Sequence, residues 1–278
     1  MRVRGYLNGL SAAAFILLAA PTAVNAQQPK ADAPFNAPDE ATIPSGPLGD
    51  AIRLGKLLAT ETGTRLPDHV GNALRCASCH LDAGRTQHAA PWVGVWGVFP
   101  EYRSRNAMVN LLEDRINDCF ERSLNGKRLP LDSTEMRAMQ SYMRWLSQGV
   151  PTGVNVQGRG FKRIAAPAPA DPARGKEVYA AKCVACHGPD GQGMFGASGE
   201  MLFPPLWGPR SFSIGAGMGR LNTAAAFVKA NMPFGQGGTL TDQEAYDVAA
   251  YFTQQPRPDF ARKQQDWPKG DKPEDARY

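Results

Sequence analysis

The spacing of apolar residues along the chain predicts short helices rather than strands. Between positions 112 and 124, apolar residues recur at intervals of four: Leu112, Ile116, Phe120 and Leu124. This is the period of a single buried helical face. Asn125-Gly126 follows and supplies a helix stop. We therefore predict one helix over residues 105–126, RNAMVNLLEDRINDCFERSLNG.

Three polar residues share one face of this predicted helix. Arg115, Cys119 and Ser123 stand at positions i, i+4 and i+8, and side chains at that spacing stack above one another. A positive charge, a sulfur and a hydroxyl would then point into one pocket.

The same order of elements occurs twice along the chain. Helices are predicted over residues 48–61 and 171–182, each with a central Gly-Lys pair, Gly55-Lys56 and Gly175-Lys176. A glycine at a helix crossing permits close approach of another helix. We expect Tyr251 of a later helix to pack on Gly175, and Trp145 to pack on Gly55.

Each half also ends in a helix with a predicted capping box. Asp132 with Glu135 begins one helix that runs through Trp145, and Thr241 with Glu244 begins another that runs through Phe252. Two similar sets of helices predict a mostly α fold of two small domains.

A Gly-, Pro- and Ala-rich stretch, Pro151 to Pro172, separates the two sets of helices and indicates an extended linker. We place the domains at residues 27–160 and 161–278. After Gln255 the tail is polar and Pro-rich. It either wraps over a surface through Phe260 and Trp267 or is disordered.

The first 26 residues have the pattern of a secretory signal peptide. Arg2 and Arg4 precede an apolar run from Leu10 to Ala20, and Val24-Asn25-Ala26 offers small residues for cleavage. The run is too short to cross a bilayer as a helix. The alternative is an uncleaved anchor. With residues 1–26 removed, no membrane span is expected.

The formal charge of the chain is +5, of which Arg2 and Arg4 contribute two. Lys and Arg are scattered rather than clustered, and no nucleic-acid motif is present. We therefore expect no nucleic-acid partner.

Four of the five cysteines fall into two Cys-x-x-Cys-His motifs: Cys76, Cys79 and His80, and Cys183, Cys186 and His187. This motif is typical of c-type haem attachment. Two thiols one helical turn apart form thioethers with the haem vinyl groups, and the adjacent histidine reaches the iron. The sequence therefore predicts two covalently bound haems c, with His80 and His187 as iron ligands.

The sixth iron ligands differ between the halves. In the second half Met232, within Asn231-Met232-Pro233, is the predicted ligand, and a methionine raises the haem potential. Three other methionines are alternatives, Met194, Met201 and Met218. Met232 as a simple packing residue is the remaining alternative.

In the first half, the fifth cysteine, Cys119, is the candidate ligand, because no comparable methionine loop follows His80. A thiolate ligand lowers the haem potential. His69 and His88 are alternatives at the same position. An inert buried thiol or an intermolecular disulfide is also consistent with an odd cysteine.

Four arginines crowd the stretch around Cys119: Arg103, Arg105, Arg115 and Arg122. Acidic residues alternate with them, so a salt-bridged helix face is one interpretation. Arg115 differs because it shares the face of Cys119. Guanidinium groups beside an open thiolate favour a small oxyanion, which they bind through paired hydrogen bonds.

Five stretches resemble the di-haem thiosulfate dehydrogenases, whose first domain is similar to the cytochrome subunit of the Sox thiosulfate-oxidising complex. They are GNALRCASCHL (71–81), APWVGVWGVFPEY (90–102), RINDCFERS (115–123), FPPLWG (203–208) and NMP (231–233). The resemblance implies that the cysteine-ligated haem is the active site, with Cys119 as ligand. It also implies that Arg105, Arg115 and Ser123 bind substrate.

The function implied is oxidation of two thiosulfates to tetrathionate, with tetrathionate reduction as the reverse reaction. A soluble cytochrome or similar acceptor would take the electrons. Haem attachment outside the cytoplasm predicts a periplasmic protein. Two alternatives remain, a Sox-type cytochrome subunit and a non-catalytic di-haem electron carrier. Turnover of thiosulfate by the isolated chain separates the carrier from the enzyme.

Overall fold

The computed structural model describes residues 32–278, apart from 166–167, together with Met1. The predicted signal peptide, Met1 excepted, lies outside the described residues. Among the described residues, no helix has the length and apolar character needed to cross a membrane.

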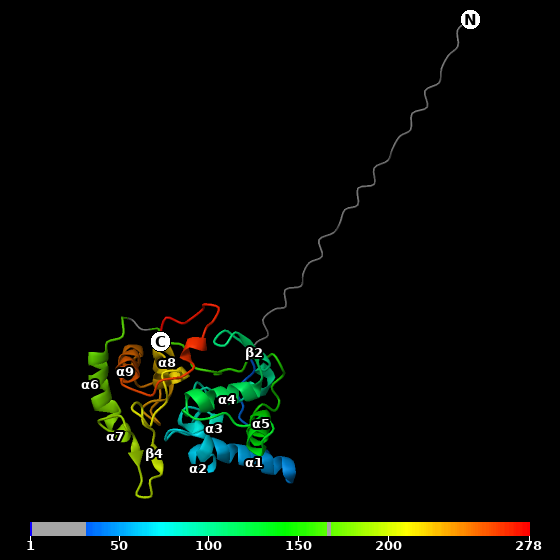
Figure 1. Cartoon of the computed structure of the whole chain (residues 1–278), viewed down its shortest axis with the longest axis horizontal. Helices are drawn as coiled ribbons and strands as arrows, with labels where there is room; N and C mark the ends of the chain where they lie inside the picture. Colours follow the sequence, from blue (N-terminus) through cyan, green and yellow to red (C-terminus); the bar gives the residue numbers. More distant parts are fainter. Residues whose placement is uncertain (2–31, 166–167) are drawn as a thin grey trace. The chain divides into compact units, whose positions relative to one another are not determined.

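The fold is mostly α, as predicted, with two small antiparallel strand pairs, β1 with β2 and β3 with β4 (Figure 1). The helices of the first half are α1 (Pro47–Thr60), α2 (Thr62–Arg65), α3 (Leu81–Gly84), α4 (Leu112–Arg122) and α5 (Thr134–Leu146). Those of the second half are α6 (Pro172–Lys182), α7 (Val184–His187), α8 (Leu221–Asn231) and α9 (Asp242–Gln254). The strands are β1 (Glu101–Arg103), β2 (Met108–Asn110), β3 (Met194–Phe195) and β4 (Met201–Phe203).

Helices α6 and α9 pack closely at a glycine, as predicted. A Cβ atom on Gly175 would lie 1.9 Å from the carbonyl oxygen of Asp247 and 2.9 Å from Cβ of Tyr251. Only glycine permits so short a distance between the two helices. The predicted capping box of α9 is also confirmed: Thr241 and Glu244 exchange side-chain to backbone hydrogen bonds.

Helices α1 and α5 pack in the same way, but with a different aromatic residue. A Cβ on Gly55 would lie 2.2 Å from the Ala138 carbonyl oxygen and 2.7 Å from Cβ of Tyr142. The expectation of Trp145 was wrong. Tyr142 lies one helical turn earlier, on the face that meets α1. The cap of α5 is Ser133, whose side chain accepts from the Met136 amide, so the predicted capping box of Asp132 and Glu135 was also wrong.

The predicted helix over residues 105–126 begins seven residues late. Residues 101–110 form a β-hairpin in which Tyr102 pairs with Val109. The turn places Ala107 at φ 52° and lets the Asn106 side chain accept a hydrogen bond from the Met108 amide. The helical period starts only at Leu112, and Leu112, Ile116 and Phe120 are buried as predicted.

The linker and the tail are ordered by contacts with the domains. Between α5 and α6 the described residues form no helix or strand, but Val156 is buried and forms an isolated bridge with Ala33. In the tail, Phe260 and Trp267 are buried, so the tail wraps over the surface. The described residues from 32 onward pack as one compact unit, and the domain boundary near 160 stays a prediction.

Candidate functional site

The first Cys-x-x-Cys-His motif forms one tight turn. The amides of Cys79 and His80 donate to the carbonyl oxygen of Cys76 at 3.2 Å and 3.0 Å, which brings the two thiols to the same side of the chain. Burial raises the pKa of both thiols to about 12. Two reduced thiols one turn apart are what thioether formation with a haem requires.

The His80 ring is fixed by its surroundings. Its Nδ1 lies 2.6 Å from the Ala90 carbonyl oxygen and is assigned as the protonated nitrogen, and Trp92 packs on the ring at 4.8 Å between centroids. Burial lowers the pKa of His80 to about 4, so the ring is neutral at neutral pH. Its Nε2 is then free to bind iron, an arrangement typical of haem and metal histidines.

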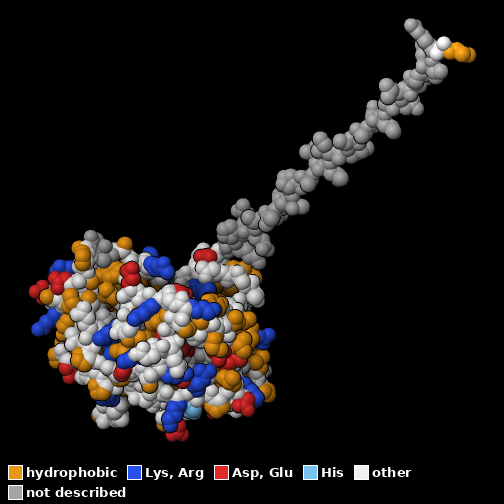
Figure 2. Space-filling view, turned by 45° about the horizontal axis from the view of Figure 1, so that its top comes forward, with side chains coloured by type: hydrophobic (Ala, Val, Ile, Leu, Met, Phe, Trp, Pro, Cys, Tyr) orange, Lys and Arg blue, Asp and Glu red, His pale blue; other side chains and the backbone are white. Residues whose placement is uncertain are grey.

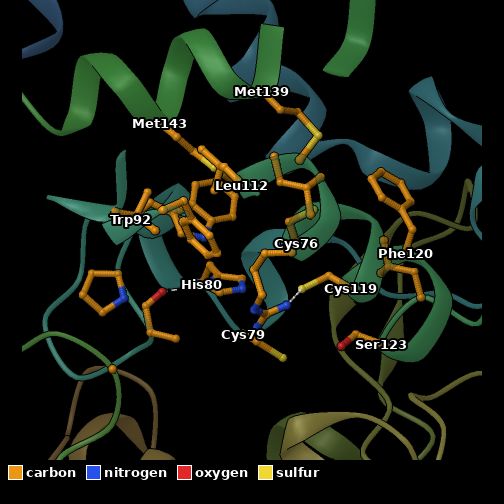
Figure 3. A pocket seen from close by; sticks show the side chains of 18 of the residues that line it. Cys76, Cys79, His80, Trp92, Leu112, Cys119, Phe120, Ser123, Met139 and Met143 are labelled. Atoms are coloured by element: carbon orange, nitrogen blue, oxygen red, sulfur yellow. Dashed lines mark hydrogen bonds between the residues drawn. The ribbon is translucent and has the colours of Figure 1, made fainter. Parts of the chain in front are cut away.

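A cavity of about 260 Å³, here called cavity 1, lies against this motif (Figure 3). Its walls are mostly apolar, with polar and sulfur-bearing side chains at intervals. The chemically distinctive lining residues are Arg75, Cys76, Cys79, His80, Glu101, Arg103, Arg115, Cys119, Ser123, Met139, Met143 and Arg159.

Helix α4 brings Arg115, Cys119 and Ser123 to cavity 1 together, as the i, i+4, i+8 spacing predicts. Arg115 Nη1 donates to Cys119 Sγ at 2.8 Å, drawn as a dashed line in Figure 3. The charge on Cys119 raises the pKa of Arg115, more than burial lowers it. Ser123 caps the helix, and its amide donates to the Cys119 carbonyl oxygen at 2.8 Å.

Arg105 does not line cavity 1. It lies in the turn between β1 and β2, and its Nε donates to Asp266 of the tail at 3.0 Å. Arg103, in β1, does line the cavity and pairs with Glu101 at 2.9 Å. The sequence alone favoured Arg105 over Arg103 through the family pattern, and strand alternation in the hairpin could have indicated Arg103.

The four arginines of this region, Arg103, Arg105, Arg115 and Arg122, differ in their partners. Arg122 pairs with Asp118 and Asp266, each at 2.7 Å, as a salt-bridged helix face would. Arg115 alone among the four has no carboxylate partner in the described part of the chain. Of these four arginines, Arg115 is therefore the one that brings to cavity 1 a charge without a carboxylate partner.

The two histidine alternatives to Cys119 lie elsewhere. Neither His69 nor His88 lines cavity 1, and His69 Nδ1 lies 3.1 Å from the Lys127 carbonyl oxygen. Sequence reasoning missed Met139 and Met143, which reach the cavity from α5 (Figure 3). Their i, i+4 spacing on the buried face of α5 was the available signal.

The second motif lines a larger cavity of about 500 Å³, here called cavity 2. Cys183, Cys186, His187 and Met232 all face it. His187 Nδ1 lies 2.9 Å from the Pro204 carbonyl oxygen, and burial lowers its pKa, as for His80.

Three methionines line cavity 2. Met232, directly after α8, lines the cavity, and so do Met201 and Met218. Met194 does not line it and is 40% exposed. Each cavity thus offers two thiols, a histidine with a free Nε2 and a further sulfur, which fits one covalently attached haem.

Cavities 1 and 2 share part of one wall, because Leu74, Arg75 and Cys79 line both.

On the surface shown in Figure 2, basic side chains lie among acidic and apolar ones. This distribution agrees with the scattered charges of the sequence.

Comparisons with known proteins match the two halves separately. Residues 69–152 match the family described as SoxA/TsdA, cytochrome c domain, and residues 170–252 match Cytochrome C oxidase, cbb3-type, subunit III. The chain has two cytochrome c domains, which carry two covalently attached haems.

Three proteins that match most of this chain are thiosulfate dehydrogenases. The thiosulfate dehydrogenase of Psychrobacter arcticus is 49% identical over 86% of this chain and 73% of its own length. That of Allochromatium vinosum is 47% identical over 89% of this chain and 93% of its own. The solved thiosulfate dehydrogenase (TsdBA) of Marichromatium purpuratum is 44% identical, with a TM-score of 0.75, and covers 79% of this chain. This chain spans about half of that protein (48%).

Proposed function

Because the chain belongs to the thiosulfate dehydrogenase family, we propose that it joins two thiosulfate ions in cavity 1, 2 S2O3(2−) → S4O6(2−) + 2 e−. The observation that carries this proposal is the contact between Arg115 and Cys119, inside the cavity of the first Cys-x-x-Cys-His motif. A sulfur and a guanidinium that has no carboxylate partner among the described residues converge there on the space beside His80.

His80 and Cys119 would hold the iron of the first haem, and His187 and Met232 that of the second. When bound, the two haems supply one-electron acceptors for the two electrons that the reaction releases. A soluble cytochrome or similar carrier then takes these electrons, and the protein works in the periplasm. Tetrathionate reduction is the reverse of the same reaction.

The protein's own residues offset the negative charge of the two thiosulfate ions. Two dianions repel each other, so their approach requires positive groups that are already in place. Arg115 provides one inside cavity 1, and Arg105 provides a second from the adjoining hairpin. The Ser123 hydroxyl, on the same helical face as Cys119, donates a hydrogen bond to a thiosulfate oxygen. Apolar neighbours such as Leu112 and Ile116 exclude water and strengthen these interactions.

Electron paramagnetic resonance of the oxidised holoprotein tests the ligand assignment. We expect two low-spin haem species, one of which has the signature of a thiolate ligand. Cys119→Ala should abolish that species and leave the other unchanged. Met232→Ala should do the opposite and lower the potential of the second haem, because a methionine ligand raises it.

A Cys119→Ala protein with the parental spectrum would show that Cys119 is not the ligand. If that spectrum has no thiolate signature, Met139 and Met143 are the candidates in cavity 1. An unchanged second potential in Met232→Ala would assign that role to Met201 or Met218.

A further inference from the structure

Asp266, in the C-terminal tail, is a buried carboxylate between the hairpin turn that carries Arg105 and the last turn of α4. Its side chain is 2% exposed. It accepts two hydrogen bonds from Arg122, both at 2.7 Å, and one from Arg105 Nε at 3.0 Å. The Tyr278 hydroxyl donates a further one. A tail that merely covered a surface would not need a buried charge shared by two arginines.

The tail holds Arg105 by more than this carboxylate. The Trp267 amide donates to the Arg105 carbonyl oxygen at 2.7 Å, and the Arg105 guanidinium lies 4.8 Å from the Trp267 ring centre. Arg105 Nη2 donates to the Tyr278 hydroxyl at 3.2 Å. Arg105 Nη1 has no hydrogen-bond partner in the described part of the chain. One edge of the guanidinium is therefore fixed and another is left to donate.

The same carboxylate is tied to the helix that bears Cys119. Arg122 is in the last turn of α4, next to Ser123, and its Nε donates to Asp118 at 2.7 Å. Asp266 thus joins the hairpin that carries Arg105 to the end of α4.

We propose that Asp266 is a positioning residue for thiosulfate, which holds Arg105 so that its free Nη1 edge can bind the anion. The inference rests on the proposed function, in which Arg105 contacts substrate. A side chain fixed before binding loses less conformational entropy when the ligand arrives, so substrate binds more tightly.

Charge alone predicts the opposite effect of Asp266. A carboxylate near the site repels a dianion, so its neutralisation would strengthen thiosulfate binding if attraction were the only factor. Positioning predicts that the same change weakens binding. The direction of the change in KM therefore separates the two roles.

The test is thiosulfate oxidation by Asp266→Asn holoprotein, which is nearly isosteric with the parent. We expect KM to rise about tenfold, the low end of the effect of one charge-assisted hydrogen bond, with kcat within about twofold. Asp266→Glu keeps the charge and should give an intermediate KM. The resonance signals of both haems should stay as in the parent.

Asp275→Asn is the matched control. Asp275 belongs to the same tail and pairs with Arg220 at 2.7 Å, and its side chain is 9% exposed. Loss of this pair loosens the tail without touching Arg105, so KM should stay within about twofold of the parent. A tenfold rise in this control as well would overturn the proposal, because any loosening of the tail would then suffice.

A double-mutant cycle shows whether Asp266 acts through Arg105. Arg105→Gln should raise KM by itself, and Asp266→Asn should add nothing to that variant. An equal further rise in the double variant, or a lowered or unchanged KM in Asp266→Asn alone, would overturn the role of Asp266. A parental KM in Arg105→Gln would instead count against the substrate role of Arg105.

Discussion

Arg115 stays charged at any pH at which the protein is folded. A guanidinium keeps its proton at ordinary pH, and the charge on Cys119 raises the pKa of Arg115 further. Arg103, Arg105 and Arg122 each pair with a carboxylate, whereas the side chain of Arg115 donates to the sulfur of Cys119 and pairs with no carboxylate among the described residues. At the scale of single residues, this difference in partners is the reason we propose Arg115 as the principal anion-binding group of cavity 1.

Replacement of Arg115 should therefore weaken thiosulfate oxidation strongly. A charge-assisted hydrogen bond contributes roughly 1.5–3 kcal/mol, so Arg115→Gln should reduce kcat/KM by roughly 10- to 150-fold. Arg115→Lys keeps the charge without the paired donors and should recover only part of this loss. Steady-state assays with thiosulfate and ferricyanide measure both variants.

Arg128→Gln is a suitable control. Arg128 lies just beyond α4, and its partially exposed side chain pairs with Asp114 and Glu121. Its kcat/KM should match that of the parent. If both Arg115 variants oxidise thiosulfate like the parent, the anion site lies elsewhere.

Local spacing predicted much of the site at this scale. The two Cys-x-x-Cys-His motifs and the i, i+4, i+8 series through Cys119 are properties of neighbouring residues, and the fold keeps them. Arg103 and Met139 reach cavity 1 from other elements. Their convergence depends on tertiary packing, which no local pattern records. For the same reason the sequence did not show that Asp266 forms an ion pair with Arg105.

At the scale of elements, the helix pairs α1 with α5 and α6 with α9 each cross at a glycine that has no room for a side chain. The atom facing it is a backbone carbonyl oxygen, of Ala138 in one pair and of Asp247 in the other. Backbone atoms cannot rotate away as side chains do. Each pair must separate if the glycine gains a methyl group.

Gly175→Ala and Gly55→Ala should consequently destabilise the protein, each by about 1–3 kcal/mol as over-packing typically does. Gly217→Ala is the matched control, because a Cβ at that position meets nothing within 4 Å. Thermal unfolding of the three variants measures the effect. Equal midpoints for Gly175→Ala, Gly217→Ala and the parent would show that the helices separate at no cost.

The errors in predicted elements have particular causes. The helix predicted from the apolar spacing of residues 112–124 also takes in residues 105–111, yet Tyr102 and Val109 pair across a hairpin. Such pairing depends on contacts across a turn and has no helical period, so a search for the 3.6-residue period does not reveal it. The tail lacks periodicity altogether, and it is ordered by Phe260, Asp266 and Trp267, which pack on the domains.

At the scale of the whole molecule, the adjoining cavities account for the two-domain plan. Leu74, Arg75 and Cys79 line both, so one short segment before and within the first motif separates the two haem sites. We expect electrons to cross this shared wall from the first haem to the second. The two haems would have different sulfur ligands, a thiolate from Cys119 and a thioether from Met232. This difference would make the second haem a stronger electron acceptor than the first.

Turnover by Cys119→Ala protein that retains both haems tests the central claim most directly. Purified parent holoprotein should reduce ferricyanide with thiosulfate and form one tetrathionate for each two electrons. The account predicts that Cys119→Ala, shown by mass to carry two haems, loses this turnover although dithionite still reduces its second haem. Parental turnover in that variant would contradict the account, because thiosulfate would then be oxidised without Cys119.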